Sequence, residues 1–283
     1  MMKPFLTHTI ICPNCGSDFN TETNRLVCKA CQHTVPLTDG KPVFTQPPDN
    51  LKPSQKLERG PNLGTPWRQA NWCFLESQIA LLPVSGIILD VGAGRGDFEA
   101  LLAGHDYISL DVYPYPETDI ACDLTVINPF RPNSFDAILL MNVLEHVFDT
   151  RRFIASLTHT LKPGGKLILA IPFMVKMHQE PLDFVRYTHY ALGAIAAHHQ
   201  LKVAELEGYY DPMFFLGESI GNIKFAYLPF IQGSKRYPAR ALLYSLEKLA
   251  GQLAKLIGQG KTSLPMETRS HAPTGYHAVF LKP

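Results

Sequence analysis

The sequence lacks a long hydrophobic run, an excess of charge and an apolar leader. Its longest apolar stretch, from Leu167 to Val175, is much shorter than the ~18 residues that a membrane-spanning helix needs. The 26 basic and 25 acidic side chains leave a formal net charge of +1, whereas nucleic-acid-binding proteins usually carry a clear basic excess. No apolar segment typical of a signal peptide follows Met1. We therefore expect a soluble, cytoplasmic protein.

The composition predicts a folded chain with more than one part. The 283 residues are 46% hydrophobic, which suffices for a sizeable core and excludes a disordered chain. A length of ~150 residues per domain gives about two domains. Nine of the 23 prolines lie in the first 66 residues, and proline resists both helix and central strand. We expect a small module over 1–45, a proline-rich linker over 46–66 and a large domain over 67–283.

From Trp67 onward, strand-like apolar runs alternate with helical stretches, which predicts a parallel α/β sheet. Almost seventy residues separate the last two predicted strands, so we expect an insert of about 211–274 before the final strand. The predicted strands are 87–91, 107–111, 135–141, 166–171, 201–207 and 276–281. The predicted helices are 67–82, 97–103, 149–161, 189–199 (with Thr188 as its N-cap) and 238–258.

Four of the six cysteines form two C-x2-C pairs, Cys12 with Cys15 and Cys28 with Cys31. Two such turns can complete a tetrahedral S4 metal site. About 45 residues do not easily fold alone, so a bound metal would supply the missing stability. We expect structural zinc; iron suits the same ligands, and a redox pair is the rival interpretation. The two other cysteines are predicted to be small buried side chains: Cys73 and Cys122.

This cysteine segment resembles a small zinc-ribbon family found beside some methyltransferases, in which it is either a free-standing activator or an N-terminal domain. The resemblance covers about residues 9–45 and rests on the segments Ile11-Cys-Pro-Asn-Cys15, Val27-Cys-Lys-Ala-Cys31 and Val35-Pro-Leu-Thr-Asp-Gly40.

A glycine-rich loop, Asp90-Val-Gly92-Ala-Gly94-Arg-Gly96, follows a predicted buried strand. Glycines there allow a sharp turn and the close approach of a ligand to the backbone. The spacing differs from the dinucleotide pattern G-x-G-x-x-G, and Asp90 would repel a pyrophosphate. The same carboxylate would attract the ammonium and sulfonium charges of S-adenosylmethionine.

Two further aspartates follow in the order that a nucleoside site requires. Asp111 ends the next strand, 21 residues after Asp90, where it could accept the ribose hydroxyls. Asp123 lies in a loop where it could bond the adenine amino group. Each alone is more typical of a solvated turn or cap residue, but their order on successive strand ends favours the joint interpretation.

The chain resembles the class I S-adenosylmethionine-dependent methyltransferases over about residues 67–210. Besides the loop, the matching segments are Ser134-Phe-Asp-Ala-Ile138, Asn142-Val-Leu-Glu-His-Val147 and Leu161-Lys-Pro-Gly-Gly-Lys-Leu167. The resemblance implies a doubly wound, Rossmann-like sheet of seven strands, the last antiparallel. It also implies the cofactor S-adenosylmethionine and roles for cofactor residues: Gly92, Ala93 and Gly94 line it, Asp111 holds the ribose, Cys122 and Asp123 flank the adenine, and Asn142 faces the methionyl group. Arg95 departs from the pattern, and we expect it to point outward or to pair with a carboxylate.

The loop over 172–188 leaves the carboxyl edge of the predicted sheet and is rich in reactive groups. His178 is the candidate general base, because the unperturbed pKa of histidine lies near neutral pH; a surface histidine is the alternative. His146 is a second candidate, with a capping or packing role as the alternative. Asp183 and Arg186 could form a purely structural pair. The loop resembles methyltransferases of bacterial surface-polysaccharide or lipid-linked glycan assembly, which suggests O-methylation of a small or glycan acceptor.

The predicted helix 238–258 carries an apolar stripe, and its surroundings over 232–261 hold six basic residues against Glu247 alone. A basic amphipathic helix can rest on an anionic membrane or bind RNA; a lid or a dimer helix is the equal alternative.

From these motifs together we expect a methyltransferase acting on a small or glycan acceptor. The alternatives are an RNA methyltransferase that uses the zinc module and the basic helix, and a cofactor-binding partner protein without catalysis. The oligomeric state stays open.

Overall fold

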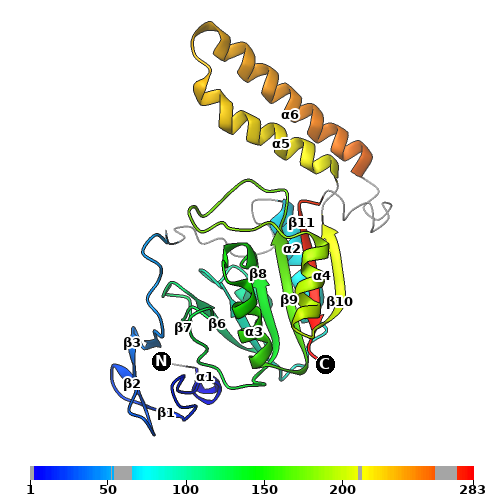
Figure 1. Ribbon diagram of the computed structural model, residues 1–283. Helices are drawn as coiled ribbons and strands as arrows, with labels where there is room; N and C mark the ends of the chain where they lie inside the picture. The colour runs from blue at the N-terminus through cyan, green and yellow to red at the C-terminus, as the bar shows by residue number, and fades with distance from the viewer. Residues whose placement is uncertain (1–2, 52, 54–65, 210–211, 259–272) are drawn as a thin grey trace.

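A computed structural model describes residues 3–51, 53, 66–209, 212–258 and 273–283 of the chain (Figure 1). Most of the predicted linker 46–66, and part of the predicted insert, lie outside the described residues. The described elements form an N-terminal unit of short strands, a large mixed sheet with helices, and a pair of long helices.

The large sheet has seven strands in the order β10-β11-β9-β8-β5-β6-β7. Strands β5 to β9 pair in parallel, whereas β11 is antiparallel to both of its neighbours, β9 and β10. The predicted doubly wound, Rossmann-like sheet with an antiparallel last strand is therefore confirmed. The strands are β5 (Ile87–Val91), β6 (Asp106–Asp111), β7 (Ile120–Ala121), β8 (Phe135–Met141), β9 (Leu161–Pro172), β10 (Lys202–Tyr209) and β11 (Gly275–Leu281).

Helices cover both faces of this sheet because its strands are apolar on both sides. Figure 1 shows α3 (Thr150–Thr160) and α4 (His189–His198) in front of the sheet and α2 (Pro66–Ile79) behind it. Adjacent residues of one strand enter opposite cores: Leu89 packs with the cluster that holds α3 and α4, and Ile88 with the cluster that holds α2. The predicted N-cap is also present, since the Thr188 side chain accepts a hydrogen bond from the Ala191 N–H.

Two local predictions were wrong. The predicted helix 97–103 is only a single 3-10 turn, η1 (Glu99–Leu101), because the preceding loop runs through left-handed glycines up to Gly96 and leaves little chain for a helix before β6. Cys73, predicted to be buried, is exposed on α2, while Cys122 is fully buried.

The N-terminal unit consists of α1 (Pro4–Thr9) and a small antiparallel sheet. Its strands are β1 (Phe19–Thr21), β2 (Arg25–Cys28), β3 (Thr34–Thr38) and β4 (Lys41–Pro42). The unit packs on the β7 edge of the large sheet, where Val43 bridges Ala121 and Ile10 bridges Phe130. The apolar side chains of the unit join the core of the large sheet: Leu6, Ile10, Leu26 and Val35. The two parts therefore share one hydrophobic core.

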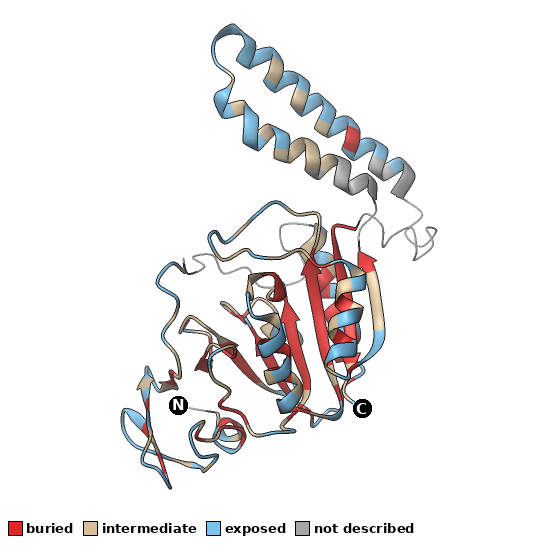
Figure 2. Ribbon diagram, in the orientation of Figure 1, coloured by how far each residue is buried: buried red, intermediate tan, exposed pale blue. Residues whose placement is uncertain are grey.

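A helical hairpin, α5 (Pro212–Tyr227) and α6 (Arg236–Gly258), projects from the sheet; η3 (Leu228–Phe230) and η4 (Gly233–Lys235) join its helices (Figure 1). The predicted helix 238–258 is confirmed and begins two residues earlier. Figure 2 shows that most of the hairpin surface is exposed. The predicted leucine stripe of α6 is solvent-exposed, with Leu242, Leu249 and Leu256 each more than half exposed. No helix within the described residues is long and apolar enough to cross a bilayer.

Candidate functional site

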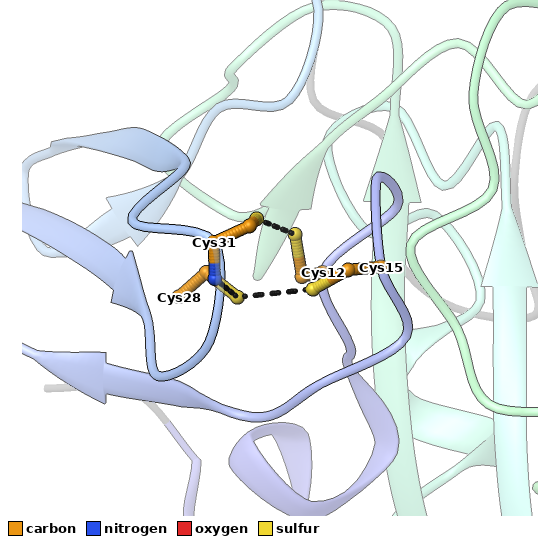
Figure 3. Close-up of side chains that lie close together, drawn as sticks. All are labelled: Cys12, Cys15, Cys28 and Cys31. Atoms are coloured by element: carbon orange, nitrogen blue, oxygen red, sulfur yellow. Dashed lines mark hydrogen bonds between the residues drawn. The ribbon is translucent and has the colours of Figure 1, made fainter.

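The four cysteines of the two C-x2-C pairs converge on one point (Figure 3). Their Sγ atoms all lie within 4.8 Å of one another, with 3.4 Å between those of Cys15 and Cys28 and 3.6 Å between those of Cys12 and Cys31. All four are free thiols. Sulfur atoms about 2.3 Å from a tetrahedral zinc ion lie roughly 3.8 Å apart, so this set fits such an ion after small adjustments.

The glycine loop turns sharply at the carboxyl end of β5. Gly92, Gly94 and Gly96 all have positive φ angles, a conformation that other residues rarely adopt. A Cβ on Gly92 would lie only 2.4 Å from Cγ2 of Val143, so this glycine lets the loop pack on the turn after β8. A Cβ on Gly94 would have nothing within 4 Å, so open space faces this part of the loop.

The two aspartates of the predicted cofactor site lie on adjacent strand ends. Asp111 accepts hydrogen bonds from the backbone N–H of Gly94 at 2.9 Å and of Tyr113 at 3.0 Å. Asp90 is buried, and burial together with the negative charges of Asp111 and Asp97 raises its pKa to about 7. A buried carboxylate with this pKa gains from a nearby positive charge.

The other predicted cofactor residues lie at the same edge of the sheet. The backbone N–H of Cys122 donates to the carbonyl of Asp111, and Oδ1 of Asp123 accepts from the N–H and hydroxyl of Thr125. Asn142 directly follows β8 and has a positive φ, and its buried Oδ1 has no hydrogen-bond partner among the described residues. A cationic nucleoside such as S-adenosylmethionine fits this arrangement. Asn142 offers it an unpaired oxygen, Gly94 leaves open space beside the loop, and Asp90 and Asp111 supply carboxylates on adjacent strand ends.

Arg95, the residue that departs from the family pattern, pairs with a carboxylate as expected. Its Nη2 lies 3.0 Å from Oε1 of Glu117. The Glu117 carboxylate therefore neutralises the Arg95 guanidinium beside the glycine turn.

The two candidate catalytic histidines come together, although they lie 32 residues apart in the chain. The rings of His146 and His178 meet edge to face with their centroids 4.9 Å apart. Their Nε2 atoms lie 3.5 and 3.6 Å from Oε1 of Glu145. The Glu145 carboxylate raises the pKa of His178, an effect that burial opposes.

The loop after β9 holds His178 in place. The carboxylate of Asp183 accepts from the backbone N–H of His178 at 2.8 Å and pairs with both terminal nitrogens of Arg186 at 2.5 and 2.7 Å. The structural pair predicted for Asp183 and Arg186 is thus present, and it also fixes the histidine. Beside it lies a pocket of about 310 Å³, lined by Leu51, His178, Gln179 and Glu180.

Glu145 is the residue that sequence reasoning missed. It lies in the 3-10 turn η2 (Leu144–His146) directly after β8 and is fully buried. Neither carboxylate oxygen has a hydrogen-bond partner among the described residues. The signal was the carboxylate next to a histidine in the turn that follows a buried strand, within a segment already noted as Asn142–Val147.

Comparison with known proteins identifies the central segment. Residues 89–169, from β5 to β9, match the family model described as a methyltransferase domain. The central segment of this chain therefore matches a methyltransferase domain. This identification confirms the family resemblance predicted from the glycine loop and the strand-end motifs.

Curated relatives of this methyltransferase domain differ in what their names say they act on. A demethylmenaquinone methyltransferase of Renibacterium salmoninarum is 36% identical over 95 residues, which are 29% of this chain and 40% of that protein. A ubiquinone biosynthesis O-methyltransferase of Xylella fastidiosa is 33% identical over 106 residues, 31% of this chain and 43% of that protein. An 18S rRNA (guanine-N(7))-methyltransferase of Schizosaccharomyces pombe is 25% identical over 154 residues, 45% of this chain and 58% of that protein.

The chain therefore spans between 40% and 58% of the length of these relatives. Among solved structures, a SAM-dependent methyltransferase from Archaeoglobus fulgidus is similar with a TM-score of 0.48 and 14% identity, over 76% of this chain and 94% of that one.

Proposed function

We propose that this protein is an S-adenosylmethionine-dependent methyltransferase that methylates a hydroxyl oxygen of a small or glycan-type acceptor. The observation that carries the proposal is the open glycine turn bonded to Asp111 at the carboxyl edge of the sheet. Ligands of doubly wound folds bind at this edge. The domain match over residues 89–169 supports the same activity.

In this proposal the cofactor lies across the ends of β5, β6 and β8. The backbone of Gly92, Ala93 and Gly94 lines the cofactor, and the Asp111 carboxylate accepts hydrogen bonds from its ribose hydroxyls. Cys122 and Asp123 flank the adenine after β7. Asp90 and Asn142 serve the methionyl end, where the buried carboxylate balances positive charge and the orphaned amide oxygen accepts the ammonium protons.

The reaction is an in-line displacement at the methyl carbon. The acceptor oxygen forms the new O–C bond, the S–C bond of the sulfonium breaks, and S-adenosylhomocysteine leaves with the bonding pair. The acceptor hydroxyl also loses a proton, and the cluster of His146 and His178 is the group at this edge that handles it. The pocket beside His178 supplies room for the acceptor, and orientation and desolvation supply much of the rate.

We also propose that the four cysteines hold a structural zinc ion. Four thiolates close the coordination sphere and leave no position for a substrate. The ion would hold together the unit whose apolar residues complete the core beside β7.

For the α5–α6 hairpin we propose contact with an anionic membrane surface. Exposed aromatics at its tip, Phe230 and Tyr237, lie near the basic residues Lys235, Arg236 and Arg240. Sedimentation with anionic but not zwitterionic phospholipid vesicles, weakened by Arg236→Glu with Arg240→Glu, supports the contact. Equal sedimentation of this double variant contradicts it.

The activity is tested with methyl-labelled S-adenosylmethionine and three acceptor pools: hydroxylated small molecules, lipid-linked or free glycans, and RNA. Label in an alkali-stable ether of the first or second pool supports the proposal. Label confined to RNA replaces it with the RNA methyltransferase alternative. Cofactor binding without transfer to any pool leaves the non-catalytic partner protein as the better account.

A further inference from the structure

Three proton-accepting side chains converge beside the proposed acceptor pocket, which His178 lines. Glu145 is fully buried, and its carboxylate oxygens and the Nε2 atom of His146 are buried atoms without a hydrogen-bond partner among the described residues. The Nε2 atom of His178 faces the same carboxylate oxygen at 3.6 Å. Burial of an unpaired carboxylate is costly unless a positive charge accompanies it.

The hydrogen bond that each histidine makes through Nδ1 determines its tautomer, and therefore whether its Nε2 presents a lone pair to the Glu145 carboxylate. Nδ1 of His146 lies 2.6 Å from the carbonyl oxygen of Leu182, and Nδ1 of His178 lies 3.2 Å from the carbonyl oxygen of Lys176. A carbonyl oxygen only accepts, so each Nδ1 carries the proton and each neutral ring presents an unprotonated Nε2. Asp183 reinforces this at His178, with Oδ2 3.4 Å from Nδ1.

We propose that Glu145, His146 and His178 bind a divalent transition-metal ion. Metal-binding histidines almost always donate their second ring N–H to a carbonyl or carboxylate, as both rings do here. The three ligand atoms lie within 4.8 Å of one another. Ligands about 2.1 Å from one ion are roughly 3.0–3.5 Å apart, so the separations of 3.5 and 3.6 Å to Glu145 need only a slight contraction.

The ligand set indicates the class of ion. Two imidazoles and one carboxylate suit Mn²⁺, Fe²⁺, Co²⁺ or Zn²⁺ and are a poor match for Mg²⁺ or Ca²⁺, which prefer oxygen. Three protein ligands leave coordination positions open. The site is thus distinct in chemistry from the closed four-cysteine set.

The role of the ion rests on the proposed function. An acceptor hydroxyl bound at an open position would have a lowered pKa and would release its proton to solvent water. The resulting alkoxide or phenolate oxygen would then form the O–C bond as the S–C bond breaks. With the ion bound, the histidines would act as ligands, and this role would replace the one as proton acceptors that the proposed function gives them without a metal.

The experiment titrates the full chain, purified with its four-cysteine site saturated with zinc, with Mn²⁺, and follows free Mn²⁺ by its paramagnetic resonance signal. We expect one bound Mn²⁺ per chain, with nitrogen couplings from histidine in the pulsed spectrum. Glu145→Gln, which preserves the side-chain volume, should weaken binding at least ~10-fold, and Asp183→Asn should weaken it ~10–100-fold through the orientation of His178. His198→Gln, at an exposed position on α4, is the matched control and should bind normally.

Absence of bound Mn²⁺ in the wild-type chain, or equal binding by Glu145→Gln, overturns the metal site. Affinity for S-adenosylhomocysteine is measured in the same samples without added Mn²⁺. We expect the wild type and Glu145→Gln to bind it alike. A chain that binds S-adenosylhomocysteine but no Mn²⁺ contradicts the metal site only, whereas a chain that binds neither contradicts the proposed function as well.

Discussion

The backbone N–H of Gly94 donates to the carboxylate of Asp111 across 2.9 Å and so ties the glycine turn after β5 to the end of β6. The same carboxylate also accepts from Tyr113. These bonds fix the aspartate before any ligand arrives, which lowers the entropic cost of binding.

Replacement of this carboxylate tests the cofactor site. Asp111→Asn should weaken binding of S-adenosylhomocysteine by ~10–100-fold, because a hydrogen bond to a charged group contributes about 1.5–3 kcal/mol. Isothermal calorimetry measures the change. Asp106→Asn, at the exposed start of the same strand, should leave the affinity unchanged. Equal affinities of the two variants would refute the placement of the ribose.

The raised pKa of Asp90 predicts a pH-dependent affinity. Its carboxyl titrates at about 7 because of burial and the charges of Asp111 and Asp97, and a cationic ligand favours the ionised form. Affinity for S-adenosylmethionine should therefore rise between pH 6 and 8, with proton release that calorimetry in buffers of different ionisation enthalpy detects. Asp90→Asn should bind weakly and without this pH dependence; a pH-independent wild type contradicts the role.

The same residue predicts the opposite trend in stability without ligand. A folded-state pKa above the ordinary 3.8 means that Asp90 favours folding below pH 4 and loses this contribution as pH rises through about 7. Asp90→Asn should therefore raise the melting temperature of the free protein more at pH 8 than at pH 5. Thermal unfolding followed by circular dichroism at the two pH values tests this, and a constant difference would count against the burial effect.

The buried His277 on β11 predicts that the protein is destabilised by acid. Its ring is stacked between Phe74 at 4.1 Å and Tyr209 at 4.2 Å, and burial lowers its pKa to about 3. The unfolded chain binds a proton near the ordinary 6.5 while the folded chain does not. Stability is therefore lost as pH falls below 6.5, by about 2 kcal/mol at pH 5.

Urea unfolding at pH 7.5 and pH 5 measures this difference. His277→Gln should reduce it by about the same 2 kcal/mol, whereas His159→Gln, at an exposed position, should keep it. An unchanged pH dependence in His277→Gln would show that other groups cause the acid sensitivity.

Loss of one zinc ligand should destabilise more than the N-terminal unit. Leu26 and Val35 of that unit lie in the core of the large sheet, so Cys28→Ser should remove the zinc and lower the main unfolding temperature by roughly 5–10 °C. Cys73→Ser, outside the cluster and exposed, should keep the zinc content of the wild type. A zinc content in Cys28→Ser equal to that of the wild type, by elemental analysis, would contradict the four-cysteine site.

Local patterns in the sequence predicted the elements whose signals are local. The buried strands Ile87–Val91 and Phe135–Met141 lie where their apolar runs predicted, and the cysteine spacing predicted the cluster of four thiols. The helix predicted over 97–103 failed because the left-handed glycines before it use the chain that a helix would need. Helix α5 was not predicted, since within the insert over 211–274 the sequence predicted only the helix 238–258.

Features that depend on tertiary contacts could not be predicted from spacing. Glu145 and His178 are 33 residues apart, and only the return of the loop after β9, where Phe184 donates to the Glu145 carbonyl, brings them together. The shared core of the N-terminal unit likewise depends on the bridges of Ile10 to Phe130 and Val43 to Ala121. None of these three contacts is indicated by a motif or a spacing in the local sequence.

The most direct test of the proposed cofactor site is calorimetric titration of the purified chain with S-adenosylhomocysteine, with NADH as the control ligand. We expect binding of one S-adenosylhomocysteine per chain in the micromolar range and none of NADH, because the glycine turn carries an acid that repels a pyrophosphate. Binding of NADH alone, or of neither ligand, would contradict it.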